Sequence, residues 1–101
     1  MIEIYREPTH PGEVLKEDFL EPLGMTQSYL ANAIGVSFRA INELVNGKRG
    51  MSTEMALRLA KYFKTSPQLW LNLQNQYDLY RVSRKKSDML DSLKPCDKIV
   101  A

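Results

Sequence analysis

Apolar residues recur every three or four positions in five segments of the chain, which is the spacing of one buried helix face. Proline and glycine separate these segments and give each of them the length of a short helix. The pattern predicts helices over residues 13–20, 27–34, 38–45, 53–63 and 67–80. Strand-like alternation occurs at residues 2–5, which are expected to form a short edge strand or a disordered lead-in.

Residues that favour helix ends flank these segments. A Ser or Thr hydroxyl can cap a helix by accepting a hydrogen bond from a backbone N–H of the first turn. Proline suits the first turn because its nitrogen carries no hydrogen, and glycine suits a left-handed residue after the last turn. The expected caps are Thr26, Ser37, Ser52 and Ser66, the first-turn prolines are Pro11 and Pro67, and the helix ends lie at residues 22–24, Gly35 and Gly47.

One side of each expected helix is apolar, and these sides together define the core. Trp70 and Leu73 are expected to complete the core against the first and fourth helices. The other inward positions are Val14, Leu15 and Phe19, then Tyr29, Leu30, Ala33 and Ile34, then Ile41, Leu44 and Val45, and finally Met55, Leu59 and Phe63.

The size of the chain fits one domain. Its 101 residues are 44% hydrophobic and can bury one modest core, so the fold class is expected to be all-α with five helices. We expect an N-terminal arm over residues 1–10, a domain over residues 11–80 and a basic tail over residues 81–101. The tail is expected either to extend the last helix or to be disordered.

The second and third helices have the residue types of a helix-turn-helix. Ala31 is small enough to let the third helix cross closely, Gly35 can take the turn conformation, and Ile41 can fill the crossing. Helical proteins that never touch DNA also contain such pairs, so the outer surface decides. The side chains left outward on the third helix are Phe38, Arg39, Asn42, Glu43 and Asn46.

These outward side chains suit the major groove of DNA. An arginine can pair with a guanine edge, an asparagine with an adenine edge, and an aromatic ring can contact a thymine methyl group. Arg39 is therefore the expected base-reading residue. Packing in the core is the alternative for Phe38, and Glu43 is expected to be a solvated charge or to orient Arg39.

Charge is distributed unevenly along the chain. Residues 1–25 hold six acidic and two basic residues, whereas residues 26–64 hold six basic and two acidic residues. The positive charge thus surrounds the helix pair, although a basic loop is often only a solvated surface. The residues expected to bind phosphates, which positions a protein without specifying sequence, are Gln27, Ser28, Asn46, Lys48 and Arg49.

The last helix carries more large apolar side chains than a small core needs. Leu71, Tyr77 and Tyr80 are expected to form a self-complementary dimer patch. Helix-turn-helix dimers place two heads about 34–36 Å apart, which is one turn of DNA. We therefore expect a homodimer.

Residue types suited to catalysis or metal binding are few. The only histidine, His10, precedes a helix start and is expected to cap it, and the only cysteine, Cys96, cannot form an internal disulfide. The sequence therefore predicts no enzyme, no metal site and no cofactor. The carboxylates that share the first helix are expected to form a solvated acidic face rather than a magnesium site, and they are Glu13, Glu17, Asp18 and Glu21.

The sequence also indicates the cellular compartment. The sequence shows no basic segment followed by an apolar stretch at its start and no apolar window of membrane-spanning length. A single cysteine fits a reducing environment. We expect a cytoplasmic protein without a membrane partner.

Two stretches carry a resemblance to a known family, HPGEVLKEDFLEPLGMTQSYLANAIGVS at residues 10–37 and NGKRGMSTEMALRLAKYFKTSPQLWLNLQNQYDL at residues 46–79. The chain resembles the HigA-type antitoxins of bacterial toxin-antitoxin pairs, also called virulence-associated protein I, within the phage-repressor-like helix-turn-helix superfamily. The most discriminating motifs are the HPGE opening, the NGKR loop and SPQLWLNLQ. The resemblance implies a lambda-repressor-like fold.

The resemblance also implies a function. It implies an antitoxin that dimerises, represses its own operon through an operator palindrome and neutralises a RelE-like toxin that cleaves messenger RNA. The partners would be double-stranded operator DNA and a cognate toxin, and the role of the tail stays open between toxin contact, operator contact and disorder. The positions that match the family's DNA contacts are Gln27, Ser28, Ser37, Phe38, Arg39, Asn42, Asn46, Lys48 and Arg49.

Two alternatives to the antitoxin remain from the sequence. One is a protein-interaction module that does not bind DNA, in which the last helix and the acidic N-terminal part bind a basic partner. The other is a stand-alone helix-turn-helix repressor without a toxin. A toxin that binds RNA would itself be basic, so the acidic segment also suits the antitoxin hypothesis.

Overall fold

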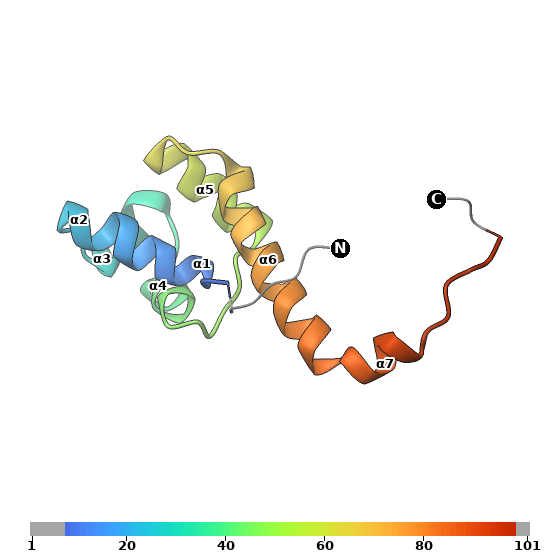
Figure 1. The fold of residues 1–101 in the computed structure, drawn as a ribbon. Helices are drawn as coiled ribbons and strands as arrows, with labels where there is room; N and C mark the ends of the chain where they lie inside the picture. Colours follow the sequence, from blue (N-terminus) through green and yellow to red (C-terminus); the bar gives the residue numbers. More distant parts are fainter. Residues whose placement is uncertain (1–7, 99–101) are drawn as a thin grey trace.

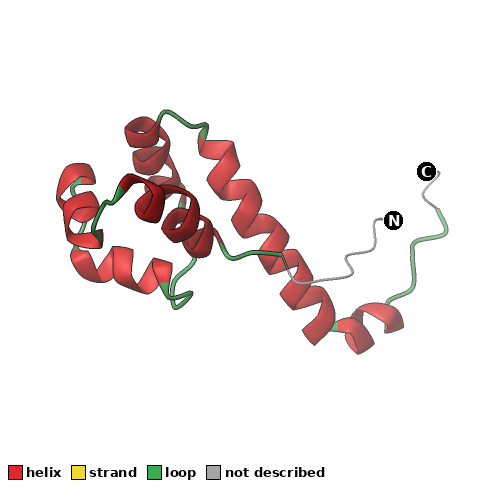
Figure 2. Cartoon of the chain, turned by 60° about the vertical axis from the view of Figure 1, so that its left-hand side comes forward, coloured by secondary structure: helices red, strands yellow, loops and turns green. Residues whose placement is uncertain are grey.

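The structure is a computed structural model that describes residues 8–98, and all regular secondary structure in this part of the chain is helical (Figures 1 and 2). The expected all-α fold with a helix-turn-helix is confirmed. The strand alternative at residues 2–5 lies outside the described residues. The elements are α1 (Pro11–Val14), the π-helix η1 (Leu15–Leu20), α2 (Glu21–Leu23), α3 (Gln27–Ile34), α4 (Phe38–Val45), α5 (Thr53–Phe63), α6 (Pro67–Lys85) and α7 (Ser87–Ser92).

Hydroxyl caps begin four of these helices, as the sequence predicts. Each capping oxygen accepts a hydrogen bond from the backbone N–H three residues later, which satisfies a donor that the helix itself cannot. His10 caps α1 in a related way, because its Nδ1 accepts from the Gly12 N–H at 2.9 Å. The hydroxyl caps are Thr26 on α3, Ser37 on α4, Ser52 on α5 and Ser66 on α6.

The first expected helix is longer than predicted and contains a π turn. α1, η1 and α2 follow one another without a break and pass through Pro22. A proline inside a helix clashes with the carbonyl of the preceding turn, and the wider hydrogen bond from the Glu21 N–H to the Lys16 carbonyl comes directly before it. The helix then ends at Gly24, whose φ of 60° is left-handed.

Gly12 explains the start of the chain's first motif. Pro11 and Gly12 are buried where α1 packs on α4. A Cβ atom at Gly12 would lie 1.7 Å from the Leu44 carbonyl oxygen. The first helix can therefore approach the backbone of α4 this closely only with glycine at position 12.

The core lies between the first helix and α3 to α6. Trp70 is fully buried, contacts the ring of Phe19 at 5.2 Å between centroids, and donates its indole N–H to the Thr65 hydroxyl at 2.9 Å. The expected core role of Trp70 is thus confirmed. The buried apolar residues are Leu15, Leu20, Leu30, Ala31, Ile34, Ala40, Ile41, Leu44, Met51, Met55, Ala56, Leu59, Ala60 and Trp70.

Two inward assignments on α3 were wrong. Tyr29 is 62% exposed, and Ala33 is exposed as well. Both fall at the edge of the apolar stripe that Leu30 and Ile34 define, and the helix is too short to bury more than a narrow stripe.

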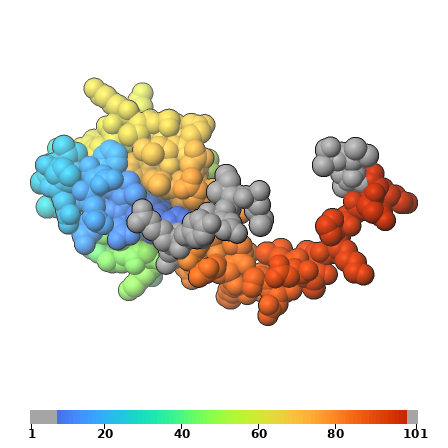
Figure 3. Space-filling view, viewed as in Figure 1, coloured from blue at the N-terminus to red at the C-terminus, as the bar shows by residue number. Residues whose placement is uncertain are grey.

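α6 leads away from the body of the molecule. Its first half packs along α5, whereas its second half and α7 extend beyond the other helices (Figures 1 and 3). The helix runs five residues past the predicted end at Tyr80, so the first part of the tail is a helical extension. No helix within residues 8–98 is long and apolar enough to span a membrane.

Candidate nucleic-acid interface

α3 and α4 cross as the sequence predicts for a helix-turn-helix. Ala31 and Ile41 are buried at the crossing, and Gly35 takes a left-handed φ of 73° between the helices. Arg58 of α5 donates a hydrogen bond from Nη1 to the Ile34 carbonyl at 2.5 Å. This bond satisfies a carbonyl at the end of α3 directly before the turn and joins α5 to that end.

The front of α4 presents exposed side chains. Phe38 is 52% exposed, so the core alternative for this residue is wrong. The side chain of Arg39 is 83% exposed. Ser37 uses its hydroxyl to accept from the Ala40 N–H at 3.0 Å, which leaves α4 with its first turn intact at the surface.

Three amide side chains form a row across the two helices. Asn42 donates from Nδ2 to Oε1 of Gln27 at 3.1 Å, which joins α4 to the first residue of α3. Asn46 in turn donates from Nδ2 to Oδ1 of Asn42 at 3.3 Å. Amide groups that hold one another in this way are oriented before a ligand arrives, and each keeps further donors and acceptors for it.

Glu43 joins two arginines on the same face. Its Oε2 accepts from Arg39 Nε at 3.0 Å, and its Oε1 accepts from Arg49 Nη2 at 2.8 Å. Hydrogen bonds from Arg39 and then Arg49 lower the pKa of Glu43, so the carboxylate is ionised at neutral pH. Of the two roles expected for Glu43, the structure shows the pairing with Arg39 rather than a charge that is only solvated.

The basic loop, residues 46–50, follows α4 and lies at the surface. Gly47 has a left-handed φ of 72°, and the Lys48 N–H donates to the Glu43 carbonyl at 2.8 Å. The loop therefore turns sharply back on α4. Lys48 and Arg49 are both exposed, as is Ser28 at the start of α3.

His10 lies behind the basic loop. Its ring meets Tyr77 of α6 edge-on at 4.8 Å between centroids. Burial is the largest influence on its pKa and lowers it, while Asp78, Glu13 and a hydrogen bond to the Arg49 backbone oppose that shift. The N-terminal motif, the loop and α6 thus meet at this one side chain.

Sequence reasoning missed the residues that support the loop from behind. The Met51 N–H donates to Oε1 of Gln74 at 2.6 Å, and Gly50 lies against the same amide group. Gln74 is part of the SPQLWLNLQ motif, and Gly50 follows the NGKR motif. The presence of both motifs was the available signal, but nothing in their spacing shows that they touch.

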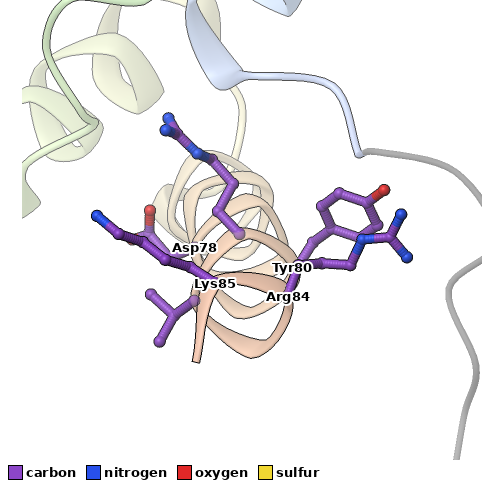
Figure 4. Close-up of a pocket in the computed structure, with 6 residues that line it drawn as sticks. Asp78, Tyr80, Arg84 and Lys85 are labelled. Carbon is purple, nitrogen blue, oxygen red and sulfur yellow. The ribbon is translucent and has the colours of Figure 1, made fainter. Parts of the chain in front are cut away.

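The three side chains expected at a dimer patch, Leu71, Tyr77 and Tyr80, are all partly exposed on α6. Leu71 packs partly against the core, and Tyr77 contacts His10. Tyr80 lies further along α6, where the Arg84 guanidinium is 5.1 Å from the centre of its ring. Figure 4 shows Tyr80 and Arg84 on one side of α6, with Asp78 and Lys85 on the other.

Residues 8–98 contain no group of three or more His, Cys, Asp or Glu side chains that could hold a metal ion. The acidic side chains of the first helix, Glu13, Glu17, Asp18 and Glu21, are all exposed. Cys96 is exposed within the described part of the tail.

Comparison with known proteins gives consistent relatives. The sequence profile of the helix-turn-helix family matches residues 16–70. Virulence-associated protein I of Dichelobacter nodosus is 44% identical over 80 residues, which cover 79% of this chain and 74% of that protein. An uncharacterised HTH-type transcriptional regulator of Haemophilus influenzae is 41% identical over 92 residues, covering 89% and 86%. Antitoxin HigA-1 of Vibrio cholerae is 36% identical over 90 residues, covering 89% of this chain and 85% of that protein.

Solved structures agree with this grouping. The antitoxin HigA of Pseudomonas aeruginosa, solved with the higBA promoter, superposes with a TM-score of 0.85 at 38% identity, covering 88% of this chain and 98% of that one. The antitoxin GraA, solved in complex with its operator, superposes with a TM-score of 0.87 at 34% identity over the full length of both chains.

Proposed function

We propose that this protein is an antitoxin and transcriptional autorepressor. The chain belongs to the helix-turn-helix family, together with HigA antitoxins and virulence-associated proteins. It binds operator DNA as a dimer and neutralises a RelE-like toxin that cleaves messenger RNA. Two relatives of similar fold, HigA and GraA, were solved with a promoter and an operator, which supports the DNA-binding half of the proposal.

One observation carries the proposal. On the exposed face of α3 and α4, polar side chains hold one another in fixed orientations, and basic residues lie beside them. The row from Gln27 through Asn42 to Asn46 offers amide groups to base edges and phosphates. Arg39 stands beside this row, where it can pair with a guanine edge. A surface that served only solubility would not need side chains fixed by one another.

We assign two kinds of DNA contact within this face. Arg39, Asn42 and Phe38 read base edges in the major groove. The remaining residues bind the backbone on both sides of the recognition helix, which fixes the register of α4 in the groove. These backbone contacts are Gln27, Ser28, Ser37, Asn46, Lys48 and Arg49.

Dimerisation is assigned to α6. Tyr80 and the exposed Leu79 and Val82 lie where the helix leaves the body, and a second copy can cover them. Residues 11–80 then form the DNA-binding and dimerising domain, residues 1–10 an N-terminal arm, and residues 81–101 a basic extension.

We place the toxin-binding surface away from the basic residues that face DNA, on the acidic first helix. The exposed carboxylates of the first helix give this region a negative field, which suits a basic, RNA-binding protein. A protein of this type works in the cytoplasm and has no catalytic residues of its own. Its partners are DNA and proteins, and it needs neither metal nor cofactor.

A stand-alone repressor is the second candidate function. It is favoured by the relative from Haemophilus influenzae, an HTH-type transcriptional regulator by name, which covers 89% of this chain, as much as HigA-1 does. The two functions share the DNA interface and differ only in the toxin.

Reporter repression and toxin rescue test the two halves separately. The DNA upstream of the gene drives a reporter, and expression of the protein is expected to lower the signal. The double variant Arg39→Ala, Asn42→Ala is expected to restore it, while the exposed Lys61→Ala on α5 is a matched control that keeps repression. Equal repression by all three proteins would remove the interface from the account.

For the toxin half, the product of the neighbouring gene is expressed with and without this protein. Growth arrest that this protein relieves supports the antitoxin. Absence of arrest, or arrest that this protein does not relieve, leaves the stand-alone repressor as the function.

A further inference from the structure

Gln74 links α6 to the basic loop. Its Oε1 accepts a hydrogen bond of 2.6 Å from the Met51 N–H, across 23 positions of sequence. Its Nε2 donates to Oδ1 of Asp78 one turn further along α6 at 2.9 Å. Because the amide is held at both ends, its oxygen stays aimed at the loop.

Gly50 lets the Gln74 amide lie close to the loop. A Cβ atom at position 50 would lie 3.2 Å from both Cδ and Oε1 of Gln74, which is closer than most contacts of a Cβ atom. The glycine therefore provides space here and does not serve a left-handed backbone. With a side chain at this position, the Gln74 amide would have to shift by a few tenths of an ångström.

The link closes the second end of the loop. At the first end, the Asn46 N–H donates to the Asn42 carbonyl at 3.0 Å and the Lys48 N–H donates to the Glu43 carbonyl. At the far end, Met51 is buried, and its N–H is held by Gln74. Lys48 and Arg49 lie between these two fixed points. Lys48 is exposed, and the partly exposed Arg49 side chain pairs with Glu43.

We infer that Gln74 is a positioning residue for DNA binding, which holds the loop so that Lys48 and Arg49 meet phosphates without first having to be ordered. This inference rests on the proposed DNA-binding function. A loop that is not held must lose conformational entropy to meet the DNA, and where that cost exceeds the energy of a phosphate contact, the contact is not made.

A purely structural role for Gln74 would have a different signature. A glutamine that only satisfied the Met51 amide would affect the fraction of folded protein and leave the number of phosphate contacts unchanged. The slope of log K against log salt reports that number, at about 0.9 per neutralised phosphate, and loss of folded protein does not alter it.

The test compares Gln74→Met with Gln76→Met in the full-length protein. Methionine has nearly the length of glutamine without its polar groups, and Gln76 is exposed on the same helix. Each variant is titrated with a duplex from upstream of the gene at several salt concentrations, and hydrogen exchange of the Met51 amide is followed by NMR.

For Gln74→Met we expect faster exchange at Met51, an affinity about fivefold lower, and a salt slope smaller by about 1, whereas Gln76→Met matches the wild type. If Gln74→Met fails to fold, Gly50→Ala, which displaces the same amide from the loop side, is expected to give the same three changes.

Either an unchanged slope or unchanged Met51 exchange in both loop variants overturns the inference while the DNA-binding function stands. If instead the wild type binds native and scrambled duplexes equally, the proposed function itself fails. The two failures are therefore distinguishable.

Discussion

Glu43 lies between two arginines on the face that we assign to DNA. It holds Arg39 and Arg49 in place, but it also places a negative charge close to where phosphates would lie. Glu43 is therefore expected to raise the specificity of DNA binding and to lower its overall affinity. The Glu43 carboxylate can weaken the binding of Arg39 to phosphates of any sequence. It still leaves Arg39 free to pair with a guanine edge where the sequence matches.

The substitution Glu43→Gln tests this balance. We expect binding to a scrambled duplex to strengthen several-fold, because a repulsive charge is lost and two guanidinium groups are released. Binding to the native duplex is expected to change less, so the ratio of the two affinities falls. Fluorescence anisotropy with both duplexes measures this ratio, and a ratio that rises would contradict the orienting role.

His10 gives the stability of the protein a pH dependence. Burial lowers its pKa, so in the interval between the folded value and the ordinary value of about 6.5 the unfolded chain binds the proton and the folded chain does not. Stability is therefore complete above this interval and falls as the pH drops through it.

The variant His10→Asn can keep the cap on α1 but has no titrating group. We expect the melting temperature of the wild type to fall relative to that of His10→Asn between pH 7.5 and a pH of about 5.5. Thermal unfolding of both proteins across this range measures the difference. A constant difference would show that His10 does not titrate in a buried position.

The sequence predicts the features within each helix, such as its cap, its end and its buried side. It does not predict the contacts between helices that lie far apart in the chain. Hydroxyl caps, the glycine turn at Gly35 and the buried stripe of α5 depend on residues within a few positions of each other. The contact of Gly12 with Leu44 and that of Gln74 with Met51 join segments far apart in the chain, and no periodicity records them. The nine proposed DNA contacts rest on the outward face of α4, the nearby basic charge and the family resemblance, and they stay predictions until DNA is bound.

The close packing of α1 on α4 predicts unequal costs for two glycine substitutions. Gly12→Ala places a Cβ against the Leu44 carbonyl and is expected to cost at least about 3 kcal/mol of unfolding free energy. Gly24→Ala meets no atom within 4 Å and strains only its left-handed backbone, at about 1–2 kcal/mol. Urea denaturation gives both values, and equal costs would contradict the close contact.

At the scale of the whole molecule, α6 carries two assignments. Its first half, through Trp70 and Gln74, belongs to the body and to the basic loop. Its second half leaves the body and exposes Leu79 and Val82, where we place the second copy. Two DNA-binding heads are then joined by the helix that also supports each loop.

The substitution Tyr80→Ala is expected to shift the protein from dimer to monomer without unfolding it, because the aromatic contact of Tyr80 is with Arg84 on its own helix. Tyr29→Ala, which removes an exposed ring from α3, is the control and is expected to stay dimeric. Sedimentation velocity at several protein concentrations measures the shift. A Tyr80→Ala protein that is as dimeric as the control would move the interface away from this part of α6.

The decisive measurement is binding of the full-length protein to DNA from upstream of its own gene, compared with a scrambled duplex at several salt concentrations. If α3 and α4 form a DNA interface, binding is saturable, favours the native duplex and weakens steadily with salt as phosphate contacts are lost. Equal and weak binding to both duplexes would show that this protein does not recognise its operator.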